Sequence, residues 1–369
     1  MLTGNKGEWS EIYVLLRLLG EGKLFPGDAD LKPLSDVFYP ILNVVRQEGD
    51  TRYTYKVKEE EGVSIEYDTE HLLFALDKKK IPISQEEFQE NADWLLSKIK
   101  ENKKSSFSCP KIEAFMHRIK CLTIRAKSTK KSDIDISIHD RRTGLQPVLG
   151  FSIKSQLGSP ATLLNASKST NFQYKLVGNL TTEEITTINE MPGRSKVKDR
   201  LEAIQAKGIK IEFSQILKNT FKNNLTLIDS LLPNILSEII LDFYSKSQNK
   251  TMTDLLTAIN SRNPLEFDNS QRHNFYDYKI KKFLTDTALG MTPAKVWNGE
   301  YDATGGYLIV KENGDIICYH IYDKNKFEDY LLTNTILETP STSRHDFGKI
   351  YEVEGELFFN LNLQVRFVK

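Results

Sequence analysis

The chain has 369 residues, enough to bury a large core and to form about two domains. Its composition, 39% hydrophobic and 27% charged with 20 Gly and 12 Pro, is that of a globular protein and excludes collagen-like and low-complexity classes. The 50 basic and 50 acidic residues balance, so net charge does not point to nucleic acid, and any such argument must rest on local charge.

The three cysteines, Cys109, Cys121 and Cys318, are widely spaced and form no CxxC pair. This pattern argues for a reducing cytosol and against a disulfide framework or a zinc site. The first residues contain no apolar core of a signal peptide, and no stretch approaches about 18 uninterrupted apolar residues. We therefore expect a cytoplasmic protein without a membrane span.

In chain order, the first expected element is a largely buried helix over residues 7–19, apolar on nearly every face and ended by Gly20 and Gly22. Within this helix, Glu11 has apolar neighbours on its own face, so we expect its carboxylate to enter an interior or a cleft and to need a partner. That partner is either a metal site or a structural cation. Glu8 is interpreted as an N-terminal acid favoured by the helix dipole.

Three further elements precede residue 121: a hairpin over residues 52–76 and helices over residues 84–101 and 110–120. A basic run without acids follows; it is either a DNA contact or a solvated face. Its members are Arg118, Lys120, Arg125, Lys127, Lys130 and Lys131.

Residues 133–154 show the clearest pattern, because residues 133–139 and 148–154 each alternate polar and apolar side chains around a turn at residues 140–147. If the turn closes symmetrically, Asp133 is opposite Lys154 and Asp135 is opposite Ser152, all on one polar face.

Two carboxylates and an ammonium group on one sheet face can do chemistry together. The acids can hold a divalent metal ion, which lowers the pKa of its bound water, while the lysine positions that water or stabilises the charged phosphorus. An edge hairpin carrying only a surface ion pair is the alternative, and the pattern alone leaves both open.

The second half is expected to be mostly helical from residue 181, with helices over residues 229–244 and 251–259 and a strand over residues 209–213. The tail is expected to return to β structure, with a tight turn at Asn313-Gly314. The strands are expected over residues 307–311, 315–322, 330–338 and 350–368.

Two segments of the hairpin, residues 131–135 (KSDID) and 150–156 (GFSIKSQ), resemble the core motif of PD-(D/E)XK nucleases. Together with five other segments, they make the chain similar to the HpaII restriction enzyme family over nearly its whole length. These segments are residues 4–11, 157–167, 170–172, 344–348 and 361–366.

The resemblance implies a mixed α/β fold, with a PD-(D/E)XK core sheet flanked by helices, a helical insertion and a β-rich C-terminal region. Residues 1–185 are expected to form the catalytic core and residues 186–369 to contribute to DNA recognition. Asp133 takes the motif's first Asp, and Lys154 takes its Lys. Ser152 occupies the second acid position, which is a departure from the motif.

Because Ser152 cannot supply the missing charge, either another acid compensates or the site holds one metal ion. The acids considered are Asp135, Glu11 and Glu113. Gln156 lies on the same face and could orient water or bind a phosphate; a plain exposed polar residue is the alternative.

Base readout favours Arg, Asn and Gln, and the small polar loop over residues 158–167 suits a close approach to phosphate. By residue type and position, the candidates for DNA contact are Arg141, Arg142, Ser159, Asn165, Ser167, Asn171, Arg344 and His345. The six histidines show no HxH or HExxH spacing, and His139 is interpreted as a solvated turn residue.

The resemblance implies a Mg²⁺-dependent type II restriction endonuclease that cuts double-stranded DNA at a short palindrome, CCGG in the namesake enzyme. A homodimer follows from the symmetry of such a target, and a separate cognate methyltransferase is expected. The alternatives are a catalytically silent DNA-binding protein, motivated by Ser152, and a nuclease with different or modification-dependent target choice.

Overall fold

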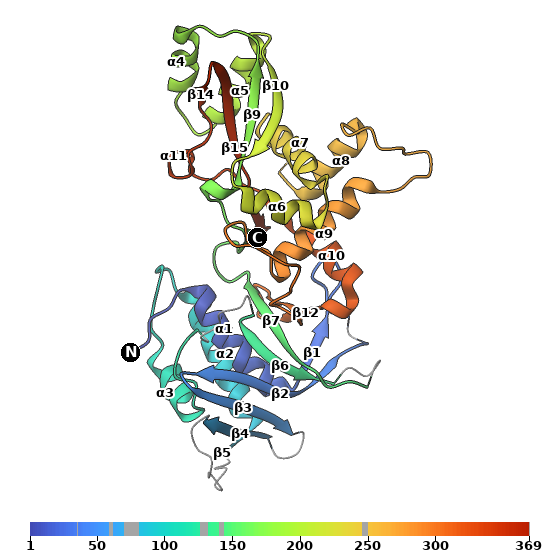
Figure 1. The fold of residues 1–369 in the computed structure, drawn as a ribbon. Helices are drawn as coiled ribbons and strands as arrows, with labels where there is room; N and C mark the ends of the chain where they lie inside the picture. Colours follow the sequence, from blue (N-terminus) through green and yellow to red (C-terminus); the bar gives the residue numbers. More distant parts are fainter. Residues whose placement is uncertain are drawn as a thin grey trace. The chain divides into compact units, whose positions relative to one another are not determined.

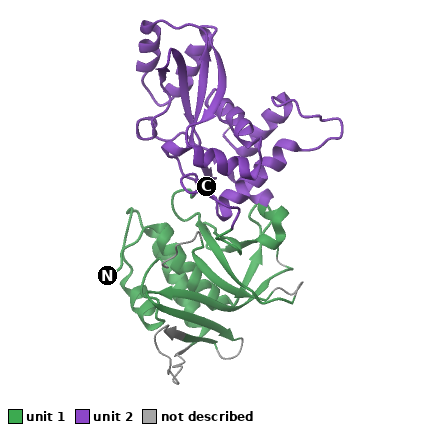
Figure 2. Cartoon of the chain, in the orientation of Figure 1, with its two compact units in different colours: residues 1–161, 301–327, 369 green, residues 162–300, 328–368 purple. Residues whose placement is uncertain are grey.

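The computed structural model describes residues 1–34, 36–58, 62–69, 81–125, 132–139, 144–245 and 250–368 (Figure 1). The chain forms two compact units (Figure 2). Unit 1 consists of Met1–Ala161 and Tyr301–Phe327, and unit 2 consists of Thr162–Glu300 and Glu328–Val368. Each unit is discontinuous in sequence, so their limits differ from a single division at residue 185.

In the described part of unit 1, nine strands form one sheet in the order β1–β12–β11–β7–β6–β2–β3–β4–β5. The strands are β1 (Lys23–Pro26), β2 (Tyr39–Glu48), β3 (Thr51–Lys58), β4 (Gly62–Thr69), β5 (Ile81–Ile83), β6 (Ile134–Ile138), β7 (Val148–Ser155), β11 (Gly306–Val310) and β12 (Ile316–His320). The expected pair of strands over residues 52–76 is β3 and β4; residues 70–80 lie outside the described residues.

The sheet of unit 1 is partly closed, a feature that the expected core sheet flanked by helices did not include. Leu24 pairs with Tyr39 of β2, while Phe25 pairs with Ile317 of β12, so β1 joins the two sides. Six strands, β1, β12, β11, β7, β6 and β2, thereby form a ring. β1 has four residues, which is too few for an alternation of polar and apolar side chains to predict the strand from the sequence.

Three helices of unit 1 are close to the expected ones: α1 (Lys6–Glu21), α2 (Gln85–Glu101) and α3 (Pro110–Arg118). α1 begins with a capping box between Asn5 and Glu8 and ends at Gly22, whose φ of 68° favours glycine. α1 packs against α2 and against β2 and β7 of the sheet (Figure 1). Its apolar faces, including the fully buried Trp9 and Leu16, form much of the core of unit 1.

The expected hairpin is present as β6 and β7, but its register differs by two residues from symmetric closure. Ile134 is opposite Phe151 and Asp135 is opposite Gly150, not Ser152. Gly150 permits this pairing, because a Cβ atom there would lie 2.8 Å from the Cβ atom of Ser132. An even shift preserves the faces, so Asp133, Ser152 and Lys154 still share one.

β6 and β7 are internal strands, flanked by β2 and β11. The alternative of an edge hairpin with a surface ion pair is therefore wrong. Ser152 is 3% exposed, and the face that the pattern indicated as polar is largely covered.

Unit 2 contains a four-stranded antiparallel sheet, β10–β9–β15–β14, and a three-stranded sheet, β13–β16–β8, among its described residues. Its strands are β8 (Thr162–Leu164), β9 (Asn171–Val177), β10 (Lys210–Ile216), β13 (Thr335–Leu337), β14 (Ile350–Val353), β15 (Glu356–Asn362) and β16 (Val365–Phe367). Its helices are α4 (Thr182–Glu190), α5 (Lys196–Ala206), α6 (Asn219–Ile228), α7 (Leu232–Ser245), α8 (Met252–Arg262), α9 (Phe275–Leu289) and α11 (Thr342–His345), with a 3₁₀ turn at Lys168–Thr170. The helical middle and the strand near residue 209 are confirmed.

The strand expected over residues 330–338 is wrong for its first half. α10 (Lys324–Thr333) occupies that part, and only β13 is extended. Phe327, Tyr330 and Leu331 are all buried, and this three- and four-residue spacing is helical. The expected turn at Asn313-Gly314 is confirmed, since Gly314 has a φ of 107° and its amide donates to the Lys311 carbonyl.

The three cysteines are buried and free. Within the described ranges, no single helix is long and apolar enough to cross a membrane. The consecutive helices α6 and α7 pass that test only when taken together, and they are bent by 109°.

Candidate active site

Asp133, Ser152 and Lys154 are joined by hydrogen bonds on β7 and just before β6. The Ser152 hydroxyl donates to Asp133 Oδ2 at 3.0 Å, and the Ile153 backbone amide donates to the same oxygen at 2.7 Å. Lys154 Nζ in turn donates to Ser152 Oγ at 3.0 Å. The shared face predicted for Asp133 and Lys154 is therefore present, with Ser152 as the link between them.

Lys154 lies in a strongly desolvated environment. Its ammonium is 5.0 Å from the ring centre of Tyr307, which is 2% exposed and lies opposite Ser152 on the neighbouring strand β11. Burial lowers the pKa of Lys154, and the charges of Asp133 and Glu11 oppose this effect. Tyr307 was not predicted as a site residue, because β11 follows β7 far along the chain and only the sheet order brings the two strands together.

Glu11 on α1 is electrostatically coupled to the same group. Burial, and then the charge of Asp133, raise the pKa of Glu11 to about 8, against the opposing charges of Arg125 and Arg46. The Glu11 side chain is half-buried, in agreement with its apolar neighbours on α1.

The other two acids considered as replacements for the missing one lie elsewhere. Asp135 is exposed and is opposite Gly150. Glu113 on α3 is 3.8 Å from the N-terminal ammonium. The carboxylates whose charges act on the pKa of Lys154 are those of Asp133 and Glu11.

A hydrogen bond between α1 and β7 fixes the position of Glu11 relative to Lys154. The hydroxyls of Ser10 and Ser155, the residues next to these two side chains, form a hydrogen bond of 2.8 Å. Ser10 is fully buried and also donates to the Lys6 carbonyl. α1 is thus attached to β7 at the level of the candidate site.

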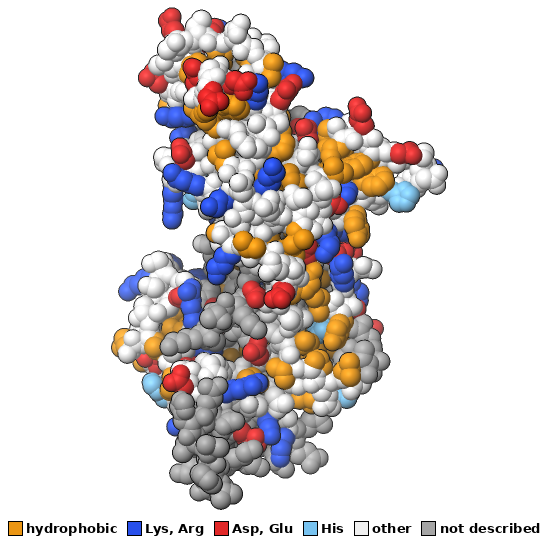
Figure 3. All heavy atoms as spheres, viewed as in Figure 1, with side chains coloured by type: hydrophobic (Ala, Val, Ile, Leu, Met, Phe, Trp, Pro, Cys, Tyr) orange, Lys and Arg blue, Asp and Glu red, His pale blue; other side chains and the backbone are white. Residues whose placement is uncertain are grey.

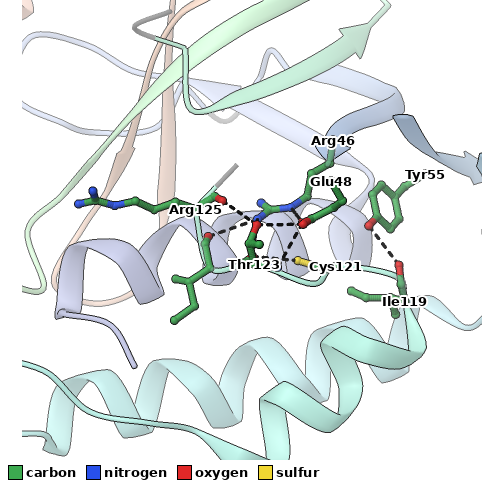
Figure 4. Close-up of polar contacts among 8 residues, drawn as sticks. Arg46, Glu48, Tyr55, Ile119, Cys121, Thr123 and Arg125 are labelled. Atoms are coloured by element: carbon green, nitrogen blue, oxygen red, sulfur yellow. Dashed lines mark hydrogen bonds and ion pairs between the residues drawn. The ribbon is translucent and has the colours of Figure 1, made fainter. Parts of the chain in front are cut away.

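A buried cation on β2 was not anticipated (Figure 4). Arg46, 6% exposed, donates from Nε to Glu48 at 2.5 Å and from Nη2 to the Thr123 carbonyl, and the Thr123 hydroxyl donates to Glu48 at 2.9 Å. This network holds the segment that leads to Arg125, whose guanidinium forms an ion pair with Glu8 at 2.9 Å. The sequence feature that could have predicted this buried cation is the position of Arg46 at the end of the largely apolar segment 41–46.

The basic run is divided by these contacts. Arg118 forms an ion pair with Glu87 and Arg125 with Glu8, while Lys127, Lys130 and Lys131 lie outside the described residues.

Gln156 is half-buried beyond the end of β7, and its backbone amide donates to the Val310 carbonyl at 2.8 Å.

Five of the eight DNA-contact candidates belong to unit 2, whereas the hairpin belongs to unit 1. Arg141 and Arg142 lie outside the described residues, and His139, half-buried, is 3.1 Å from the amide nitrogen of Gln146. Ser159 is exposed in unit 1, and Asn165 is exposed in unit 2. Ser167 caps a 3₁₀ turn by accepting from the Ser169 amide.

Asn171 has a structural position. It is 2% exposed, and its amide donates to the carbonyls of His345 and Asp346 at 2.9 and 3.2 Å. It is therefore placed to hold the short helix α11, where Arg344 is exposed and His345 is half-buried. Burial, and then the charge of Arg344, lower the pKa of His345.

The described residues contain no group of three His, Cys, Asp or Glu side chains arranged to hold a metal ion. Among the described residues, the carboxylates whose charges act on Lys154 are those of Glu11 and Asp133. This set fits Mg²⁺, which prefers hard oxygen ligands and is usually held by one or two carboxylates plus water and substrate phosphate.

Comparison with known proteins identifies the relatives of this chain. A family profile described as HpaII restriction endonuclease matches residues 5–367. The type II restriction enzyme HpaII of Haemophilus parainfluenzae is 49% identical over 368 residues, which are 99% of this chain and 99% of that enzyme. No solved structure matches the chain.

Proposed function

The chain belongs to the HpaII restriction endonuclease family, and on this premise we propose that it cuts double-stranded DNA with Glu11, Asp133 and Lys154. The observation that carries this assignment is the hydrogen-bonded series Lys154–Ser152–Asp133, to which Glu11 is electrostatically coupled. Membership of the family makes the chain a site-specific endonuclease. The residues, the metal ion and the target sequence CCGG are proposals.

In this proposal the chain is a variant of the PD-(D/E)XK arrangement. Asp133 and Lys154 occupy the motif's first and last positions, and Ser152 stands where a second acid is expected. Glu11, coming from α1, supplies the missing carboxylate. The raised pKa of Glu11 supports this exchange, since a half-buried acid beside another acid gains most from a bound cation.

Hydrolysis requires a water oxygen to form a bond with phosphorus while one phosphorus–oxygen ester bond breaks and the leaving oxygen takes a proton. A bound Mg²⁺ would neutralise phosphate charge and lower the pKa of water. Lys154 Nζ, with its lowered pKa, is suited to orient the attacking water and to take its proton. Ser152 holds both Lys154 and Asp133 in position.

The partners follow from the substrate. A palindromic target would be cut on both strands by a homodimer, with one site for each strand. A separate methyltransferase of the same specificity would protect the host DNA. Modification-dependent target choice remains the alternative within the nuclease class.

Digestion of a DNA of known sequence in Mg²⁺, followed by fragment mapping, tests the proposal. We expect discrete fragments whose ends all lie within one short palindrome, CCGG. Ends at another palindrome would overturn the target sequence alone. If supercoiled plasmid stays intact in Mg²⁺ while the protein still shifts a specific sequence in EDTA, the silent DNA-binding alternative is correct.

A further inference from the structure

Unit 2 contains a cavity of about 1040 Å³ beside its four-stranded sheet. Its walls come from the connection between α4 and α5, residues 189–196, and from residues 342–351. Gln173 on β9 and Asn360 on β15, which are directly opposite each other, also line it. This cavity takes no part in the candidate active site of unit 1.

Four side chains along this face of the sheet form a hydrogen-bonded series, called here the polar row: Gln215, Gln173, Tyr351 and Asn360. Gln215 Nε2 donates to Gln173 Oε1 at 2.8 Å, and Gln173 Nε2 donates to the Tyr351 hydroxyl at 2.7 Å. That hydroxyl donates to Asn360 Oδ1 at 2.8 Å. Each bond fixes the orientation of the next amide, so the donors and acceptors of the row have a set order.

The strands present these polar groups because their sequences alternate. Phe172 and Tyr174 of β9 face the helices, where the Tyr174 hydroxyl donates to the Ser237 carbonyl of α7 at 2.7 Å. Gln173 therefore faces the opposite side. A β-bulge between Phe213 and Gln215 shifts β10 by one residue and places Gln215 opposite Gln173.

The polar row has hydrogen-bonding capacity left at both ends. Asn360 is 8% exposed, and its Nδ2 donor has no partner among the described residues. At the other end, Gln215 Oε1 is an acceptor without a partner within the same ranges. A donor suits the O6 and N7 acceptors of guanine, and an acceptor suits the N4 amino group of cytosine.

We propose that this cavity is a nucleobase-recognition site, in which the polar row, three of whose members (Gln173, Tyr351 and Asn360) line the cavity, reads guanine and cytosine of the DNA target. The proposal rests on the proposed function, and it assigns base recognition to unit 2 and cutting to unit 1. The base could be read in the groove of the duplex or after it is turned out of the helix; both present the same hydrogen-bonding groups.

The walls of the cavity are held in place by buried polar contacts. Arg200 of α5, 4% exposed, donates to the carbonyl of Gly348 on one wall and to those of Asn189 and Met191 on the other. The Asn189 amide also bonds both backbone groups of Ile350, each at 2.8 Å. Such preorganisation is what a site for specific recognition needs.

The rim supplies cations that suit the DNA backbone. Lys196 and Lys349 line the cavity, and neither has an ion-pair partner in the part of the chain that the structure describes. Two acids, Glu190 and Asp346, line it as well, and Asp346 is 3.6 Å from the ammonium of Lys168. Figure 3 shows Lys and Arg side chains along the left edge of unit 2, where Figure 1 places α11 and β14.

The test measures binding of full-length protein to two fluorescent duplexes in Ca²⁺, by anisotropy. One duplex carries the mapped target, and the other has one G·C pair of it replaced. Asn360→Asp keeps the acceptor for Tyr351 and removes the free donor, so we expect the affinity ratio between the duplexes to fall about 10-fold to 100-fold. Asn223→Asp, on the exposed surface of α6, is the matched control and should keep the ratio.

Gln215→Met is the second variant. Since Gln215 is exposed, the fold should survive its replacement, and we again expect a loss of discrimination. In contrast, Lys349→Gln should weaken both duplexes equally and reduce the salt dependence of binding. A fluorescent cytosine analogue within the target distinguishes a base turned out of the helix, which raises its emission, from one read in the groove, which leaves the emission unchanged.

An unchanged ratio in both Asn360→Asp and Gln215→Met, with wild-type protein still cutting its target in Mg²⁺, would overturn the recognition site and leave the proposed function intact. Wild-type protein that neither cuts nor prefers any duplex would overturn both.

Discussion

Ser10 and Ser155 form a 2.8 Å hydrogen bond that joins the first helix to the strand carrying Lys154. Each serine is the neighbour of a proposed site residue, Glu11 on α1 and Lys154 on β7. The bond therefore determines how far the carboxylate of one element lies from the ammonium of the other. A helix that packs on the sheet only through apolar side chains would have more freedom to slide along it.

Ser10→Ala should test this positioning role. It removes the hydrogen bonds of the Ser10 hydroxyl to Ser155 and to the Lys6 carbonyl, each of which contributes about 1 kcal/mol to stability. We expect kcat to fall by about 10-fold with little change in KM for DNA, because Ser10 positions Glu11 relative to Lys154 and is not a proposed DNA contact. Ser97→Ala, which removes an exposed hydroxyl on α2, is the control and should leave kcat unchanged. Equal kcat for Ser10→Ala and wild type would show that the contact is structural only.

Lys154→Ala and Asp133→Asn should each reduce cleavage by at least about 10³-fold, because each removes a group that acts on the transition state. Binding to the target duplex in Ca²⁺ should survive in both variants. Single-turnover cleavage and anisotropy measure the two effects separately. Asp135→Asn provides the comparison, since Asp135 is exposed and lies opposite Gly150 rather than Ser152, and it should cut at nearly the wild-type rate. Loss of cleavage in Asp135→Asn would instead indicate that Asp135 on β6 is a metal ligand.

The alternation of residues 133–139 and 148–154 was sufficient to predict the hairpin and the face that carries Asp133, Ser152 and Lys154. It could not give the register, which depends on Gly150 and its close approach to Ser132. Nor could it give Tyr307 or the ring closed by β1, because these contacts join segments far apart in sequence. Glu11 was predictable as a buried acid from its neighbours on α1, but its coupling to Asp133 required the packing of α1 on β7.

The same limit applies to unit 2. The pattern of β9 predicts one polar and one apolar face, yet the polar row also needs a bulge in β10 and two strands from the C-terminal tail. Asn171 was selected as a base contact by residue type and loop position, and Gln173 was not selected. The two residues lie on the same face of one strand, but the amide of Asn171 is used by the carbonyls of α11.

Ser152→Ala should show what the serine contributes in place of an acid. The hydroxyl bonds two charged groups, and such bonds contribute about 1.5–3 kcal/mol each. We expect cleavage to fall about 10-fold to 100-fold, while the Mg²⁺ concentration for half-maximal rate changes little. The measurement is therefore the cleavage rate as a function of Mg²⁺ concentration, which gives the maximal rate and the half-maximal concentration separately. A large increase in the required Mg²⁺ concentration would instead make Ser152 a direct metal ligand.

The raised pKa of Glu11 predicts how stability depends on pH without divalent ions. Below the ordinary pKa of about 4.5, Glu11 is protonated in both states and folding is unaffected. Between that value and about 8, the unfolded chain loses the proton while the folded protein keeps it, so the free energy of unfolding falls as pH rises. At about 1.4 kcal/mol for each pKa unit, and with partial solvation of the carboxylate, we expect a loss on the order of 2–4 kcal/mol.

Urea unfolding of wild type and Glu11→Gln in EDTA, from pH 5 to pH 9, isolates this effect. As pH rises, the free energy of unfolding of Glu11→Gln should increase relative to that of the wild type, since the glutamine stays neutral. Mg²⁺ should then stabilise the wild type more at pH 8 than at pH 6, because the proton competes with the ion for the Glu11 carboxylate. The same addition should stabilise Glu11→Gln much less at either pH. Equal stabilisation of both proteins by Mg²⁺ would place the ion away from Glu11, even if the pH dependence is as expected.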